Sequence, residues 1–187
     1  MLNYNSAIKE NKNYNDLTIK EIVPIMKLNI RGKKKEFFTN VSKILNMILP
    51  TEANTSSTND KLTSIWLSPD EWMIYSNDPI ENNNNSYELE ESIYSNISKN
   101  NLGSISDVTD QFVMINLEGK KIFELLNSGS PFNFNEFKEK KGLTTQTILN
   151  HIDVIIHNKN INNVNLFVRR SFAEHLWSWM NDSARFL

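Results

Sequence analysis

The chain has 187 residues, a formal net charge of -2 and a sequence pI near 6.0. This length allows one well-buried core or two small units packed together. The near-neutral charge gives no electrostatic case for a nucleic-acid or anionic-membrane partner. Because there is no cysteine, the chain cannot form a disulfide, a thiolate metal site or a cysteine nucleophile.

The N-terminal segment combines charged residues and asparagines with isolated apolar ones. We therefore expect residues 1–18 to form a flexible N-terminal arm. The segment lacks the apolar centre of a signal peptide, and no part of the chain approaches the apolar length of a membrane span. These features predict a cytoplasmic protein with no membrane partner.

The first half of the folded chain should begin with a strand over residues 22–30 and a helix that ends before Pro50, followed by a loop over 51–61. Next, the sequence Trp66-Leu67-Ser68-Pro69-Asp70-Glu71-Trp72 predicts a hairpin, because proline presets the backbone angle of a turn. Asp70 and Glu71 are adjacent and point apart, so we do not expect them to act as an acid-base pair. A helix and a short strand near Ile105 should complete this half.

The second half should contain a strand over residues 112–117, a helix that ends before Gly129 and an irregular corner over 130–137. Residues 144–156 have the threonine and β-branched content of a strand, either regular or interrupted by a bulge. The last strand should start at Leu166.

The end of that strand leads into the final helix. Ser171 and Glu174 have the spacing of a capping box, which predicts that a helix starts there. Phe172, Leu176 and Trp179 form an aromatic stripe, which Trp177, Met180 and Phe186 widen. Such a stripe usually packs in a core, and a partner-facing surface is the alternative. The candidate subunit-contact residues are Arg169, Arg170, Trp177 and Trp179.

An internal repeat organises these elements. Residues 26–38 resemble residues 114–126, since each segment reads as a strand, a Gly-Lys-Lys turn and a helix. The chain therefore has an expected α+β fold of two fused ferredoxin-like β-α-β-β-α units, with helices packed on antiparallel sheets. Residues 19–187 should form a single compact domain built from repeats at about 22–108 and 111–187.

The sequence contains no recognisable catalytic or metal-binding constellation. Backbone amides at the two Gly-Lys-Lys turns could attract phosphate, but neither turn fits a known phosphate loop, and a structural role is favoured. The three histidines, His151, His157 and His175, are scattered. A serine-nucleophile motif of the GxSxG kind is also missing.

At four segments the chain resembles the gamma subunit family of heterotetrameric sarcosine oxidase. The 66–72 hairpin matches the family's Trp-Leu-Gly-Pro-Asp-Glu-Trp turn, with Ser68 in place of glycine. The other matching segments are Asp107-Val108-Thr109, Leu117-Glu118-Gly119 and Arg170-Ser171-Phe172-Ala173 with the tryptophans that follow. The similarity extends over about residues 22–187.

This resemblance implies a fold like the folate-binding domain of aminomethyltransferases and a non-catalytic subunit of a flavin- and folate-dependent oxidase that converts sarcosine to glycine. The resemblance implies no cofactor or metal in this chain. FAD, FMN, NAD and tetrahydrofolate would be bound by partner subunits, and the partners would be the alpha, beta and delta subunits.

Three alternatives remain open at this stage. The first is a stand-alone folate-binding or aminomethyltransferase-like protein, and the second is a gamma-like subunit of an N-methylglutamate dehydrogenase. The third is an RNA-binding module of ferredoxin-like fold, which the acidic charge balance and the missing aromatic-basic strand pattern disfavour.

Overall fold

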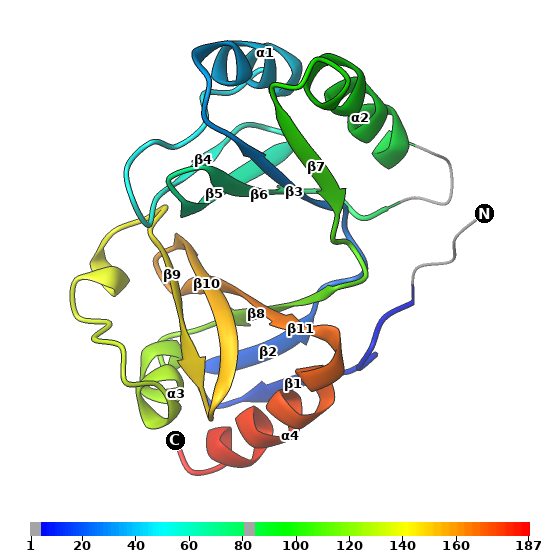
Figure 1. The fold of residues 1–187 in the computed structure, drawn as a ribbon. Helices are drawn as coiled ribbons and strands as arrows, with labels where there is room; N and C mark the ends of the chain where they lie inside the picture. The colour runs from blue at the N-terminus through cyan, green and yellow to red at the C-terminus, as the bar shows by residue number, and fades with distance from the viewer. Residues whose placement is uncertain (1–4, 81–84) are drawn as a thin grey trace. The chain divides into compact units, whose positions relative to one another are not determined.

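The computed structural model describes residues 5–80 and 85–187 (Figure 1). Within the described residues, the chain divides into two compact units, one formed by Pro24–Asp110 and the other by residues 5–23 together with Gln111–Leu187. Each unit is a sheet of antiparallel strands with helices packed on one face. The α+β fold expected from the sequence is therefore confirmed, whereas the single compact domain expected over residues 19–187 stays a prediction.

The first unit contains a five-stranded sheet with the order β4-β5-β6-β3-β7. Its core lies between this sheet and the helices, where Phe37 and Val41 of the first helix meet Trp72 and Ile74 of the sheet. The Trp72 indole donates a 2.8 Å hydrogen bond to the Pro50 carbonyl oxygen, so this buried ring keeps its polar group satisfied. The elements of this unit are β3 (Lys27–Gly32), α1 (Lys35–Leu45), β4 (Ser56–Thr58), β5 (Leu62–Ser68), β6 (Glu71–Ser76), α2 (Asn85–Ile93), a π-helical turn (Tyr94–Ser98) and β7 (Gly103–Asp107).

The second unit contains a six-stranded sheet with the order β1-β2-β8-β11-β10-β9. Alternate residues of its strands, such as Ile115 and Leu117, face two helices and are fully buried, as the period of a half-covered strand requires. The elements of this unit are β1 (Asn11–Tyr14), β2 (Leu17–Glu21), β8 (Phe112–Glu118), α3 (Ile122–Gly129), a 3-10 turn (Phe137–Glu139), β9 (Thr144–Leu149), β10 (Ile152–Asn160), β11 (Asn163–Arg169), a 3-10 turn (Arg170–Phe172) and α4 (Ala173–Ala184).

The two units share one strand order, which explains the repeat seen in the sequence. β3 and β8 occupy equivalent places, each followed by a helix and three further strands. On its other side, each of them pairs with a strand from outside this run of a helix and three strands. β2 pairs with β8, although the strand that follows β2 along the chain is β3. Conversely, β7 pairs with β3, although the strand that follows β7 along the chain is β8. Each unit is thus completed by a strand whose chain runs on into the other unit.

Glycine is required at the start of both Gly-Lys-Lys turns. A Cβ atom at Gly32 would lie 2.3 Å from the ring of Phe37, which packs directly over that backbone. Gly119 has a φ of +130°, and a Cβ atom there would lie 2.1 Å from the Asp16 carbonyl oxygen. Close packing against Phe37 therefore favours glycine at position 32, and the positive φ favours glycine at position 119.

The flexible arm expected over residues 1–18 is wrong at 11–18, because β1 and the start of β2 lie there. Residues 1–4 are outside the described part. Glu21, only 8% exposed, accepts hydrogen bonds from the backbone amides of Ala7, Ile8 and Lys9 at 2.8, 3.0 and 2.7 Å. A local composition rule could not foresee this, because the carboxylate that orders the segment lies 12 or more residues away along the chain.

The single strand expected over residues 144–156 is in fact a hairpin. β9 and β10 pair from Leu149 and Ile152 outward, and the two residues between them, Asn150 and His151, have φ values of +48° and +64°. Two positive φ values are the geometry of a tight hairpin turn. The usual glycine is absent from this turn, which is why the sequence pattern concealed it.

The final helix begins differently from the prediction. Arg170–Phe172 forms a 3-10 turn, α4 starts at Ala173, and no side chain caps it. The capping box of Ser171 and Glu174 is therefore wrong. Within the described ranges, no helix is long and apolar enough to cross a membrane.

We expect Glu21→Gln to release residues 7–9 from the second unit. A neutral amide offers one oxygen in place of two charged ones, so the variant should lose ~2 kcal/mol of stability. Hydrogen exchange at the amides of Ala7, Ile8 and Lys9 measures the release. Glu10→Gln is the matched control, because Glu10 is half exposed and pairs with the half-exposed Lys12. Unchanged exchange at these three amides in Glu21→Gln would contradict the assignment.

Candidate functional site

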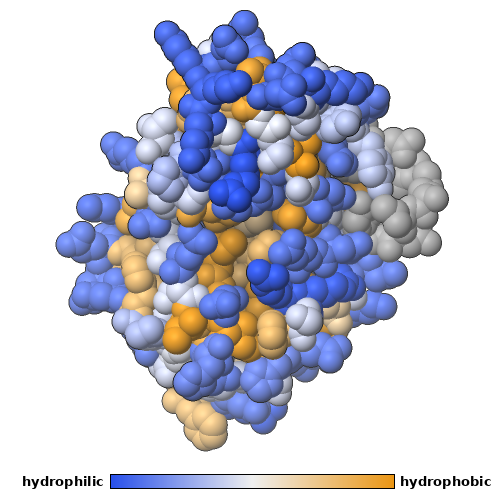
Figure 2. Space-filling model, in the orientation of Figure 1, coloured by the Kyte–Doolittle hydropathy of each residue, from blue (hydrophilic) through white to orange (hydrophobic). Residues whose placement is uncertain are grey.

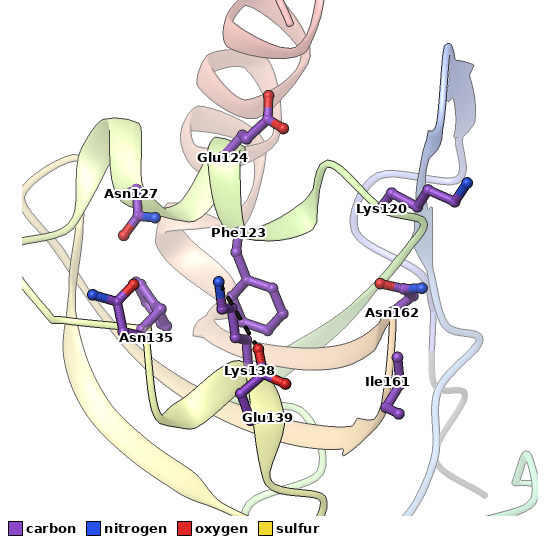
Figure 3. A pocket seen from close by; sticks show the side chains of 10 residues that line it. Lys120, Phe123, Glu124, Asn127, Asn135, Lys138, Glu139, Ile161 and Asn162 are labelled. Carbon is purple, nitrogen blue, oxygen red and sulfur yellow. Dashed lines mark ion pairs between the residues drawn. The ribbon is translucent and has the colours of Figure 1, made fainter.

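A pocket of about 310 Å³ opens on the surface of the second unit (Figure 3). Phe123 of α3 and Phe134 of the loop after α3 form its apolar floor, and Ile161, at the tip of the β10–β11 hairpin, stands at its edge. Figure 3 shows the ring of Phe123 at the centre, with the charged ends of Lys120 and Glu124 directed away from it. The remaining lining residues are polar: Asn127, Asn135, Lys138, Glu139 and Asn162.

The floor is rigid because it belongs to a cluster of phenylalanines. The Phe134 ring lies 4.9 Å from Phe132 and 5.7 Å from Phe137, measured between centroids, in edge-to-face arrangements. Phe123 is 5.8 Å from Phe134 and half-buried. Edge-to-face pairs stabilise such clusters beyond the burial of area alone. The segment expected to be an irregular corner is therefore an ordered wall of the pocket.

A buried asparagine holds the other end of this loop. Asn158 of β10 is 1% exposed, and its side-chain nitrogen donates to the carbonyl oxygens of Phe137 at 2.6 Å and Lys140 at 3.0 Å. The backbone amide of Asn158 donates to the Leu143 carbonyl oxygen at 2.8 Å. The loop is thus tied to β10 at residues 137, 140 and 143, which helps to give the pocket a preformed shape.

The Gly-Lys-Lys turns act as structural turns in both units. Lys120 lies on the rim of the pocket, whereas the amide of Lys121 donates to the Asp16 carbonyl oxygen at 3.2 Å. In the first unit, Lys33 pairs with Asp70 at 3.6 Å and the ammonium of Lys34 donates to the Asn101 carbonyl oxygen at 3.3 Å. Each turn therefore uses at least one of its polar groups within the fold, in agreement with the structural role favoured from the sequence.

Asp70 of the 66–72 hairpin is held as an anion. The Ser68 hydroxyl donates to Asp70 at 2.9 Å, and Arg31 reaches Asp70 at 3.4 Å and Glu71 at 3.8 Å. The hydrogen bond from Ser68, followed by the charges of Lys33 and Arg31, lowers the pKa of Asp70. Asp70, held in this way, is a poor proton donor at neutral pH.

The four candidate contact residues have different environments. Trp177 is 7% exposed and belongs to the core of the second unit. Trp179 is half-buried against the same core, and Arg169 is exposed. The guanidinium of Arg170 donates to the Asn5 carbonyl oxygen at 2.6 Å, within the unit. For all four residues the contact role stays a prediction.

The histidines are not arranged for catalysis or metal binding. His151 is exposed in the β9–β10 turn, His175 is exposed on α4, and His157 is buried in β10. Within residues 5–80 and 85–187, no three His, Asp or Glu side chains gather as a metal site would require.

His157 belongs to a row of polar residues that crosses the six-stranded sheet. Thr144, His157, Asn165 and Asn116 are direct partners on four neighbouring strands. The side-chain amide of Asn116 donates to Asn165 at 2.8 Å. Burial of His157, and secondarily the charge of Lys159, lowers its pKa to about 4. The imidazole is therefore neutral at pH 7 and part of the fold.

His157 should make the protein less stable in acid. Because its pKa is about 4 in the folded state and 6.5 in the reference state, the unfolded chain binds more protons between these values. The contribution of the neutral His157 side chain to the free energy of unfolding is complete above pH 6.5 and should fall by ~3 kcal/mol on acidification to pH 4. Denaturant unfolding of His157→Gln across this range should show a shallower pH dependence than the parent. His175→Gln is the control for loss of an exposed imidazole, and identical slopes for His157→Gln and the parent would contradict the assignment.

The segments that carry the family resemblance have structural roles. Asp107 accepts from the Thr109 amide at 2.8 Å, and the Thr109 hydroxyl accepts from the Lys27 amide at 3.0 Å, which closes the edge of the first sheet. Trp72 is in the first core and Ala173 in the second. The sequence missed the pocket itself. The closely spaced phenylalanines of Phe132–Phe137 and an isoleucine between asparagines at Ile161 were its only signals.

Comparisons with known proteins agree with this architecture. A model of the sarcosine oxidase gamma subunit family matches residues 32–185. No curated protein matches the chain. Among solved structures, the chain is similar to a heterotetrameric sarcosine oxidase from Corynebacterium sp. U-96 in complex with pyrrole 2-carboxylate, with a TM-score of 0.80, 18% identity and coverage of 90% of this chain and 84% of that one.

The chain is also similar to the glycine cleavage system aminomethyltransferase T from Bartonella henselae, with a TM-score of 0.60 and 13% identity. That match covers 88% of this chain and 45% of the transferase, so the chain spans under half of its length. At such identities these likenesses show the fold alone, and they confirm the expected aminomethyltransferase-like architecture. The family match extends over most of the chain, and the chain therefore belongs to the sarcosine oxidase gamma subunit family.

Proposed function

We propose that this chain is a non-catalytic subunit that assembles with the other subunits of a flavin- and folate-dependent sarcosine oxidase. The observation that carries the proposal is the family match over residues 32–185. The similar Corynebacterium structure is described as a heterotetramer, which supports assembly with further chains. Oxidation of sarcosine to glycine would then take place in those partners.

The placement of the polar groups in this chain supports a structural role. Its buried ionisable groups are used within the fold: Glu21 binds backbone amides, and the Lys27 ammonium donates to the carbonyl oxygens of Ile25 and Thr109, each at 3.1 Å. The side chains that remain exposed around the pocket suit binding better than chemistry, because the pocket has an aromatic floor and no histidine. FAD, FMN, NAD and tetrahydrofolate are accordingly proposed to bind the alpha, beta and delta subunits.

Co-expression with the alpha, beta and delta subunits tests the assembly. This chain should co-purify in a fixed stoichiometry, and its omission should reduce the yield of assembled oxidase about tenfold, because a folded state that depends on its partners is lost without them. Size-exclusion chromatography and hydrogen peroxide release with sarcosine measure the two effects. Failure to co-purify, or normal assembly and turnover without this chain, would refute the proposal. Turnover with N-methylglutamate in place of sarcosine would favour the related dehydrogenase instead.

The isolated chain should not bind tetrahydrofolate. The pocket of about 310 Å³ is at the small end of the range for ligand sites. Calorimetric titration should therefore show no saturable binding up to ~1 mM ligand. Saturable binding below that concentration would favour a stand-alone folate-binding protein, to which the similarity with the aminomethyltransferase fold draws attention.

A further inference from the structure

The pocket of Figure 3 leaves apolar surface exposed at a defined place. Ile161 is 72% exposed at the tip of the β10–β11 hairpin, and Phe123 is half-buried below it. The floor is prevented from collapsing by the phenylalanine cluster and by the hydrogen bonds of Asn158. A large apolar side chain placed between Ile161 and Phe123 would remove both from water, which is the favourable term in most protein association.

The rim offers hydrogen bonds suited to a polypeptide backbone. Asn127, Asn135 and Asn162 line the pocket and are exposed, and none of their side chains makes a hydrogen bond within the described ranges. Each carboxamide carries both donors and an acceptor. A peptide group has the same pair of functions, so three such side chains can bind an extended main chain without requiring a charge.

The charges on the rim are balanced. Two lysines and two glutamates line the pocket, and Lys138 already pairs with Glu139 at 3.9 Å. A pocket for a phosphate-rich partner would carry a clear excess of positive charge. The balance therefore favours an uncharged segment. Figure 2 shows hydrophilic residues over most of this face of the molecule, with hydrophobic ones gathered over the part of the second unit where β9 and β10 lie.

We propose that this pocket docks an extended, uncharged segment of another subunit of the oxidase, with one large apolar side chain inserted between Phe123 and Ile161. The inference rests on the proposed function, because it needs a partner subunit. It assigns the contact to a surface other than the tryptophans and arginines predicted from the sequence.

Two isoleucines provide a matched test. Ile161→Asp places a charge at the pocket, and Ile48→Asp places the same charge at an equally exposed isoleucine of the first unit, 79% exposed. The affinity of each variant for the other oxidase subunits, purified without this chain, is measured by surface-immobilised binding. Ile161→Asp should weaken binding at least about tenfold, as expected for the anchor of an interface, and Ile48→Asp by less than about twofold. Circular dichroism checks that both variants fold.

A photo-crosslinking residue at position 161 gives a second measurement that does not depend on a charged variant. In the assembled complex it should crosslink to a peptide of another subunit that contains a large apolar residue, whereas the same group at position 48 should not. Suppose that the parent chain binds the partners. The docking site is then wrong, and the proposed function stands, if position 161 neither affects affinity nor crosslinks. The same conclusion holds if position 161 crosslinks to a second copy of this chain. If the parent chain does not bind the partners at all, both proposals fail.

Discussion

The pairing of β8 between β2 and β11 is the constraint on which the second unit depends. Ile115 and Leu117 of β8 are fully buried under the helices. The pairing register of β8 can be kept only if β2 and β11 direct their own apolar side chains to the same face of the sheet. β2 buries its apolar side chains on that face, and the carboxylate of its last residue, Glu21, orders the N-terminal segment. β11 buries apolar side chains on the same face from the other side of β8 and leads into α4. A slip of one residue would expose the core and undo these contacts together.

Contacts within the fold also hold several ionisable side chains and shape part of the surface of the chain. Buried groups capable of catalysis in other settings are satisfied within the fold: His157 is neutral in a cross-strand row, and Lys27 donates to two backbone carbonyls. Asp70 is stabilised as an anion by Ser68 and its basic neighbours. What remains available is a shaped surface, in which the phenylalanines of the 132–137 loop support an open pocket. A family of enzyme subunits can use such a surface for assembly.

Sequence reasoning succeeded where the cause of a structure is local or periodic. The two Gly-Lys-Lys turns, the 66–72 hairpin and the strand over residues 112–117 were predicted because steric demands and local apolar runs leave direct marks in the chain. It failed where a distant partner decides. The order of residues 7–9 depends on Glu21, and the β9–β10 turn adopts positive φ values without glycine. The Ser171 cap was replaced by a 3-10 turn that positions Ala173 in the core.

The sequence by itself determined the α+β class, the repeated strand-turn-helix pattern and the family, because hydrophobic period, glycine placement and ordered motifs are properties of neighbouring residues. Only the tertiary structure decided which strands complete each sheet, since β2 and β7 pair with strands on the far side of a long stretch of chain. The tertiary structure likewise placed Trp177 in the core and brought Phe123, Phe134 and Ile161 to one pocket. Contacts of this kind depend on packing between elements distant in the chain, which a pattern of nearest neighbours does not record.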